Sequence, residues 1–266
     1  MLSLLPLTAL LLAGVTETSA GQPYEHPAGS VLVIVGADHH RFIDEAFTTS
    51  RLKFAGTSYG AAFAYRRETG SYLLEARVEG SAGEAAVEGG RLASGLYHIG
   101  LGASFGRRVA EYAVGGARSV GYLGAHLSSA NSVAENEPVL ENVSVTFRHT
   151  LGLSLHQTTR LGRAAGLQVD LALPLAGWIK RAAYDGGANQ KLERDRHHVG
   201  RLLFGDSRFS IVNPLTAPRI GVTYTHRLHR NADLALTYRA GYLRVGEDAR
   251  LRAYHNGLLV GLRYSF

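Results

Sequence analysis

Apolar and polar side chains alternate along much of this chain with a period of two residues. In the segment 143–156 one parity holds mostly Val, Phe and Leu, and the other holds Ser, Thr, Arg, Gly and His. The same pattern recurs in the segments 59–66, 71–79, 97–105, 167–180, 219–229, 233–240 and 258–266. A period of two is that of a β-strand, because successive side chains of a strand point to opposite faces. The pattern predicts an all-β protein whose strands each have one apolar and one polar face.

The connections between these segments alternate strictly between short and long. Short connections are predicted at 68–70, 106–111, 161–166 and 230–232, and long ones at 85–94, 129–141 and 181–217, with 247–251 intermediate. Tight turns at one end and longer loops at the other are typical of a transmembrane antiparallel up-and-down β-barrel, in which the turns are periplasmic. A soluble barrel or sandwich could share the alternation. The charged and small residues of the polar parity favour the membrane barrel.

The strand count depends on the apolar run 30–36, the sole candidate for a strand that precedes 52–67. Counting it gives ten strands, an even number as this class requires. The run is short and apolar on both parities, so a plug inside the barrel stays open as an alternative. Eight strands, or twelve if 202–212 forms an extra hairpin, also stay open. Mixed parity in 112–128, where Arg118 falls among apolar residues, predicts a bulge.

The N-terminal segment and the composition indicate where the protein is located. Residues 1–20 form an apolar run followed by small residues and are predicted to be a removed signal peptide, which leaves 21–266 as one barrel domain. Cysteine is absent from the sequence, and beyond residue 20 no apolar run reaches the roughly 18 residues of a transmembrane helix. The net charge is +6, but Lys and Arg are scattered singly, so no nucleic-acid partner is expected.

The last nine residues place Leu258, Val260, Leu262, Tyr264 and Phe266 on one parity and end on an aromatic residue. This ending, with Tyr264 and Phe266, resembles the assembly signal of bacterial outer-membrane β-barrels. The resemblance covers the general class and no specific characterised family. It implies a location in the bacterial outer membrane, with outer-membrane lipid and lipopolysaccharide as partners and the barrel-assembly machinery contacting the C-terminal strand. It does not indicate an oligomeric state.

With the apolar parity facing lipid, many charged side chains face the lumen: Arg66, Glu75, Arg77, Glu79, Arg148, Asp170, Lys180, Arg219, Arg227, Arg239 and Arg263. A ten-stranded barrel is narrow, so these side chains are expected to meet across it. Counted from the turn end, Glu75, Asp170, Arg239 and Arg263 lie close to the periplasmic rim, and a guanidinium is expected to bridge Glu75 and Asp170. The favoured interpretation of the network is a hydrophilic core of the barrel. The alternative is a selectivity or gating plug for anionic solutes. An open pore is not expected, because aqueous channels have around 16 strands.

Histidine doublets at His39–His40 and His197–His198 are predicted to lie in outside loops. Neither His-x-x-x-His nor His-Glu-x-x-His spacing occurs, so no metal site and no cofactor are expected.

Two hypotheses of an enzymatic function remain as alternatives. Asp195-Arg196-His197, in the predicted fourth outside loop, resembles the Asp-x-His pair of the omptins, which are ten-stranded outer-membrane proteases. The resemblance implies Asp195 and His197 as catalytic residues, although the second loop holds Glu84 and Glu88 where omptins have paired Asp. A lipid hydrolase would need a nucleophile beside a base at the lipid-facing rim. Outward parity places His149 and His226 there, and Ser129, Ser132 and Ser210 are possible nucleophiles without a linking motif.

The leading function is an integral outer-membrane protein with a structural, surface-interaction or narrow transport role, and the specificity is expected in the loops 37–51 and 181–217. An enzyme at the extracellular rim is the alternative.

Overall fold

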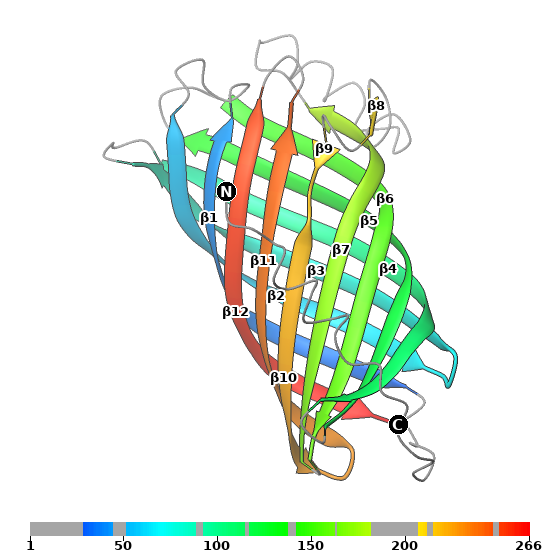
Figure 1. Ribbon diagram of the computed structural model, residues 1–266. Helices are drawn as coiled ribbons and strands as arrows, with labels where there is room; N and C mark the ends of the chain where they lie inside the picture. Colours follow the sequence, from blue (N-terminus) through cyan, green and yellow to red (C-terminus); the bar gives the residue numbers. More distant parts are fainter. Residues whose placement is uncertain are drawn as a thin grey trace.

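The computed structural model (Figure 1) is a closed antiparallel barrel of ten long strands. It describes residues 29–44, 52–88, 93–114, 117–137, 142–162, 164–181, 207–211, 215–246 and 250–266, so the predicted signal peptide lies outside the described residues. The long strands are β1 (Ser30–Asp44), β2 (Lys53–Glu68), β3 (Tyr72–Val87), β4 (Ala93–Val114), β5 (Ala117–Glu137), β6 (Asn142–Leu161), β7 (Ala165–Arg181), β10 (Arg219–His229), β11 (Ala232–Val245) and β12 (Leu251–Ser265).

Two pairings close the barrel and confirm the predicted count of ten. The first strand β1 pairs with β2 on one side and with β12 on the other, so it is a full wall strand and not a plug. The strand β10 pairs with both β7 and β11. Two short strands, β8 (Arg208–Ile211) and β9 (Leu215–Thr216), add to β7 and β11. Within the described residues, the segment 202–212 therefore supplies a short addition and not a spanning hairpin.

Several predicted boundaries were wrong because the strands continue past the expected ends. The strand β1 runs to Asp44, so His39 and His40 lie on a strand and the first loop is shorter than 37–51. The strands β3 and β4 likewise extend into the predicted loop 85–94, and β5 extends into the predicted loop 129–141. The predicted turn at 106–111 is part of β4, which continues to Val114. The register break is a bulge there, with Val109 as the extra residue opposite Gly121 and Tyr122.

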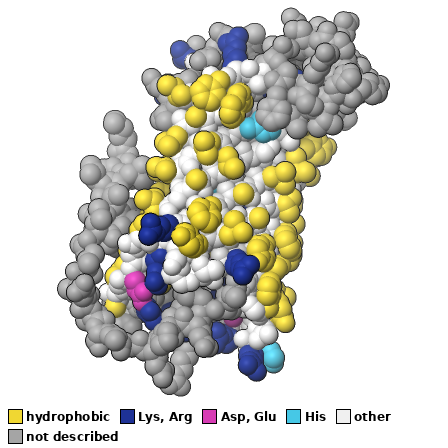
Figure 2. Space-filling model, turned by 90° about the vertical axis from the view of Figure 1, so that its right-hand side faces the viewer, with side chains coloured by type: hydrophobic (Ala, Val, Ile, Leu, Met, Phe, Trp, Pro, Cys, Tyr) yellow, Lys and Arg dark blue, Asp and Glu magenta, His cyan; other side chains and the backbone are white. Residues whose placement is uncertain are grey.

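The outward faces of the strands form an apolar belt. Large apolar side chains on alternate positions are about half exposed, among them Val35, Ile99, Leu101, Leu127 and Leu258. Figure 2 shows hydrophobic side chains spread over the middle of one face, with Lys and Arg toward the two ends. Such a belt is what a barrel presents to the hydrocarbon of a membrane. Among the described residues no helix is long and apolar enough to cross a membrane.

The inward faces hold charged residues beside glycine, and the glycines make room for the charges. A Cβ added at Gly257 would collide with the carboxylate of Asp38, and one at Gly241 would collide with the ring of His255. Glycine on the polar parity is therefore explained by close side-chain approach across neighbouring strands.

The lumen also contains apolar clusters that the parity rule missed. Phe42 and Phe54 stack near the outer ends of β1 and β2, with ring centroids 5.0 Å apart. Leu73, Val120 and Tyr122 are buried together near the turn end of the barrel. A third buried cluster, of Ile34, Ala62 and Leu259, lies between these levels, so apolar groups and charges are interspersed along the lumen.

Candidate functional site

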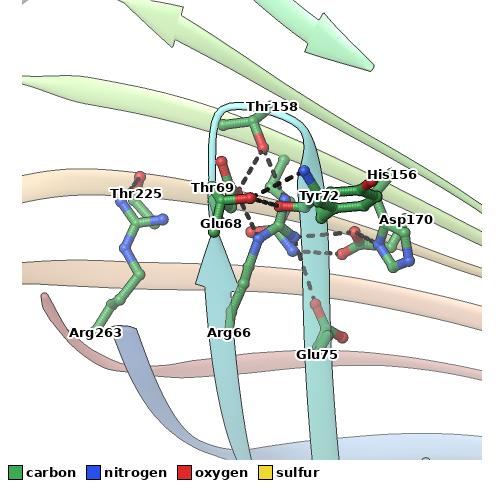
Figure 3. A network of polar contacts seen from close by, with 11 residues as sticks. Arg66, Glu68, Thr69, Tyr72, Glu75, His156, Thr158, Asp170, Thr225 and Arg263 are labelled. Atoms are coloured by element: carbon green, nitrogen blue, oxygen red, sulfur yellow. Dashed lines mark hydrogen bonds and ion pairs between the residues drawn. The ribbon is translucent and has the colours of Figure 1, made fainter. Parts of the chain in front are cut away.

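A cluster of charged side chains crosses the lumen near the turn end of the barrel (Figure 3). Its centre is Arg66 of β2, which is 8% exposed. The Arg66 guanidinium donates from Nε to Glu68 at 2.6 Å and from Nη2 to Thr158 at 2.9 Å. Its Nη1 lies 3.4 Å from a Glu75 oxygen and 3.5 Å from an Asp170 oxygen. Arg66 is thus the residue whose guanidinium reaches both Glu75 and Asp170. We call Arg66, Glu68, Glu75, Thr158 and Asp170 the lower cluster.

Histidine 156 and Gln168 hold Asp170 from the other side. The His156 Nδ1 lies 2.7 Å from one Asp170 oxygen, and the Gln168 amide donates to the other at 2.7 Å. Possible ligand atoms of Glu75, His156 and Asp170 lie within 4.8 Å of one another, close enough to share a metal ion. The Arg66 guanidinium, however, already supplies positive charge to both carboxylates. A divalent cation would have to displace it, so the donor set favours the ion pair over a metal.

Arg263 belongs to a separate contact. It donates to Asp233 from Nε at 3.0 Å and from Nη2 at 2.6 Å, and to Thr225 at 3.2 Å. Figure 3 shows Arg263 and Thr225 to one side of the Arg66 contacts. Arg263 was predicted to belong to a charged network at the periplasmic rim. Its guanidinium contacts Asp233 of β11 and Thr225 of β10 there, and it does not take part in the bridge between Glu75 and Asp170.

A second cluster lies farther from the turn end, and it contains Arg239. The Arg239 guanidinium donates to Asp38 on β1 at 2.7 Å from Nε, and to Glu79 on β3 at 2.8 Å from Nη1. Glu79 also faces Arg77 at 3.0 Å and Arg219 at 3.8 Å. Arg239 was expected near Glu75 and Asp170 but contacts neither. We call Asp38, Arg77, Glu79, Arg219 and Arg239 the middle cluster.

Arg148 of β6 differs from these arginines. The residue is 9% exposed, and its Nε has no hydrogen-bond partner among the described residues. Across the described part of the chain, no carboxylate lies within ion-pair distance of it. A buried guanidinium without an acidic partner is unusual, because burial of an unpaired charge is costly.

The middle cluster and Arg148 line a lumen cavity of about 290 Å³. Its lower end is bounded by Glu75, His156 and Asp170, and its outer end by apolar side chains that include Phe42 and Leu251. A second cavity of about 100 Å³ lies toward the turn end and is lined by Arg66, Glu68 and Arg263. The lower cluster therefore stands between the two cavities.

Sequence reasoning missed four members of these clusters, namely Asp38, Glu68, His156 and Asp233 as ion-pair partners. Asp38 and Glu68 were interpreted as parts of a loop and a turn, yet both lie on strands. Their parity could have placed them inward, since Asp38 is two residues from His40 and Glu68 is two from Arg66. His156 lies on the polar parity of its segment, but nothing in the sequence specifies Asp170 as its partner.

The geometry of the described residues gives little support to the two enzyme hypotheses. Asp195 and His197 lie outside the described residues. On the outward face, Ser129 of β5 stands directly opposite His149 of β6 in the register, and Trp178 stands opposite His149 on β7. His226 is exposed near the turn end. A Ser and a His that stand opposite each other in the register do not by themselves make a catalytic triad.

The C-terminal residues lie on the outer surface at the turn end. Tyr264 and Phe266 are 53% and 58% exposed, with ring centroids 6.4 Å apart. The backbones of Phe266 and Gly29 exchange two hydrogen bonds, from Phe266 at 2.9 Å and from Gly29 at 3.1 Å. The aromatic ending is therefore joined to the start of β1.

No family model and no curated relative matches the chain. Solved structures do match. The outer membrane protease OmpT from Escherichia coli aligns with a TM-score of 0.58 at 9% identity, over 92% of this chain and 99% of that one. Neisserial surface protein A gives a TM-score of 0.37 at 11% identity, over 89% and 97%. The chain has the fold of bacterial outer-membrane β-barrel proteins. The predicted fold and outer-membrane location are confirmed at that level, and identities this low leave the role open.

Proposed function

We propose that this protein is a narrow, gated barrel of the outer membrane that holds a small solute in its lumen cavity. The observation that carries the proposal is the division of the lumen into two cavities by the lower cluster. Arg66 lines only the smaller cavity, whereas Glu75, His156 and Asp170 line only the larger one. A solute that moves from the larger cavity toward the periplasmic end has to pass this charged layer before it enters the smaller cavity.

The lower cluster is suited to act as a gate because Arg66 is held firmly by one set of contacts and only weakly by another. The bonds from Arg66 to Glu68 and Thr158 are short, but those to Glu75 and Asp170 are 3.4 and 3.5 Å long. The longer pair is the weaker one, since hydrogen bonds lose strength as they lengthen. Opening between Arg66 and the two carboxylates would join the two cavities without breaking the wall of the barrel.

Conductance of the purified protein in planar lipid bilayers tests this. Wild type should be closed most of the time, and Arg66→Ala should raise the open fraction, because it removes the guanidinium that spans the lumen. The matched control is Arg67→Ala, which removes the same charge from the next residue, whose side chain is exposed on the outside of β2. Both variants should keep the heat-modifiable gel mobility of a folded barrel. Equal conductance of Arg66→Ala and wild type would reject the gate.

We further propose that the outer rim binds phosphate groups of lipopolysaccharide. Arg244, Arg252 and Lys53 are exposed and lie on one rung across β11, β12 and β2, with Arg41 one rung nearer the membrane centre. Arg244 and Arg252 stand directly opposite each other, an arrangement that is unfavourable unless an anion lies between them. Below them Tyr242 and Tyr254 pack with ring centroids 4.7 Å apart, as aromatic residues do at a lipid boundary.

A further inference from the structure

Positive charge exceeds negative charge in the middle of the lumen. The excess belongs to the level of the middle cluster and Arg148. At the lower end of the larger cavity negative charge prevails, because Glu75 and Asp170 share the guanidinium of Arg66, which also pairs with Glu68. At the outer end Asp44 pairs with Arg181. The remaining charged groups of the lining are four arginines and two carboxylates, a net charge of +2: Arg77, Arg148, Arg219 and Arg239 against Asp38 and Glu79. Because water and salt screen poorly in a narrow lumen, this excess favours an anion.

Of these four arginines, Arg148 and Arg219 have the weakest contacts with carboxylates among the described residues. Arg148 has no acidic partner among the described residues, and its Nε has no hydrogen-bond partner. Arg219 has Glu79 at 3.8 Å, but Glu79 lies closer to Arg239 at 2.8 Å and Arg77 at 3.0 Å. Both side chains line the same cavity. Guanidinium groups bind carboxylates through paired N–H donors, so two of them can hold one carboxylate.

The outer part of the cavity is mostly apolar, and the carboxylate there, Asp44, pairs with Arg181. Four inward-facing residues that line it there are hydrophobic, namely Phe42, Leu96, Leu243 and Leu251. Phe42 is held by stacking on the buried Phe54. A ligand that fits both parts has an anionic head and an apolar body. The volume of about 290 Å³ suits a small molecule.

We propose that the cavity binds a small monocarboxylate, with its carboxylate between Arg148 and Arg219 and its apolar part toward Phe42 and Leu251. The inference rests on the proposed function and names the class of solute that the gated barrel takes. Binding alone requires no opening of the lower cluster.

The experiment measures binding of benzoate to the purified barrel by isothermal titration calorimetry in detergent. Benzamide has the same ring without the charge, and inorganic phosphate has the charge without the ring. Benzoate should bind, and both analogues should bind more weakly. Arg148→Gln and Arg219→Gln should each weaken benzoate binding by about tenfold or more, since each removes a charged hydrogen-bond donor. The matched control Arg67→Gln removes an arginine from the outer surface of the barrel and should bind benzoate as wild type does.

Several results would overturn the inference. They are no binding of benzoate to wild type, equal binding of benzamide or phosphate, or unchanged binding to Arg148→Gln. The heat-modifiable gel shift shows whether each variant is folded, and Arg148→Lys, which keeps the charge but loses the fork, should bind with intermediate affinity. Failure here is distinguishable from failure of the gate, because the conductance of Arg66→Ala is measured without benzoate.

Discussion

Replacing Arg66 by Gln should destabilise the barrel more than any other single change of charge in the lower cluster. Arg66 is 8% exposed, and its guanidinium contacts three carboxylates and one hydroxyl. Glutamine removes the charge and cannot reach all four groups. Asp170 would keep its bonds to His156 and Gln168, but Glu75 would lose its one hydrogen bond among the described residues.

The magnitude follows from what is left behind. Removing one partner of a buried ion pair typically costs about 3–5 kcal/mol, because the remaining charge stays buried without compensation. Two of the Arg66 contacts are long, at 3.4 and 3.5 Å, which places the expected loss of unfolding free energy near the lower end, about 3 kcal/mol. The exposed neighbour supplies the control, since Arg67→Gln should change stability by less than about 0.5 kcal/mol.

The assay is unfolding by guanidinium chloride of the protein in phospholipid vesicles, monitored by tryptophan fluorescence. The sequence has one tryptophan, and Trp178 lies on β7 with 45% of its surface exposed, so its emission reports on the barrel wall. Adding Glu75→Gln to Arg66→Gln should recover about 1–2 kcal/mol by removing the stranded carboxylate. A stability for Arg66→Gln equal to that of Arg67→Gln, or no recovery in the double variant, would refute the account of the lower cluster.

Three further predictions concern the surface and the loops. Replacing Arg244 and Arg252 by Gln should lower the melting temperature in vesicles that contain lipopolysaccharide but not in neutral phosphatidylcholine, and an equal loss in both lipids would contradict a phosphate contact. Phe266→Ala should reduce the amount of folded protein in the outer membrane while leaving refolding in detergent intact, because the exposed ring is expected to act in assembly; a matched loss of refolding in vitro would point to stability. Asp195→Ala and His197→Ala should leave conductance and benzoate binding unchanged, and a peptidase activity in wild type that both variants abolish would favour the omptin-like alternative.

The topology could be predicted from the sequence because one physical constraint acts on every strand. A wall strand must present apolar groups to lipid on alternate positions, and this marks each strand without knowledge of its neighbours. The limits of the strands are less constrained. Beyond the apolar belt alternation is no longer required, so the continuation of β1 through His39 and His40 resembled a loop. The Gly-Arg-Arg stretch at 106–108 resembled a turn for the same reason, although β4 continues through the bulge at Val109.

Side-chain partners across the lumen could be predicted only in part. Parity shows that Arg239 faces inward, but its partner Asp38 is 201 residues away in the sequence. Which residues share a level depends on the stagger of all ten strands, and a single strand does not encode it. Glu75 and Asp170 share the level of Arg66, whereas Arg239 and Arg263 reach other carboxylates.

Two buried arginines in this lumen show how a structural charge can be separated from one that binds. Arg66 has four partners, so the stability of the barrel is enough to explain it. Arg148 is buried to the same extent without an acidic partner among the described residues, so an uncharged side chain at that position should be neutral or stabilising. Stability alone therefore does not explain an arginine at position 148. A ligand carboxylate would supply the missing partner, which places binding at Arg148, farther from the turn end than the ion pairs of Arg66.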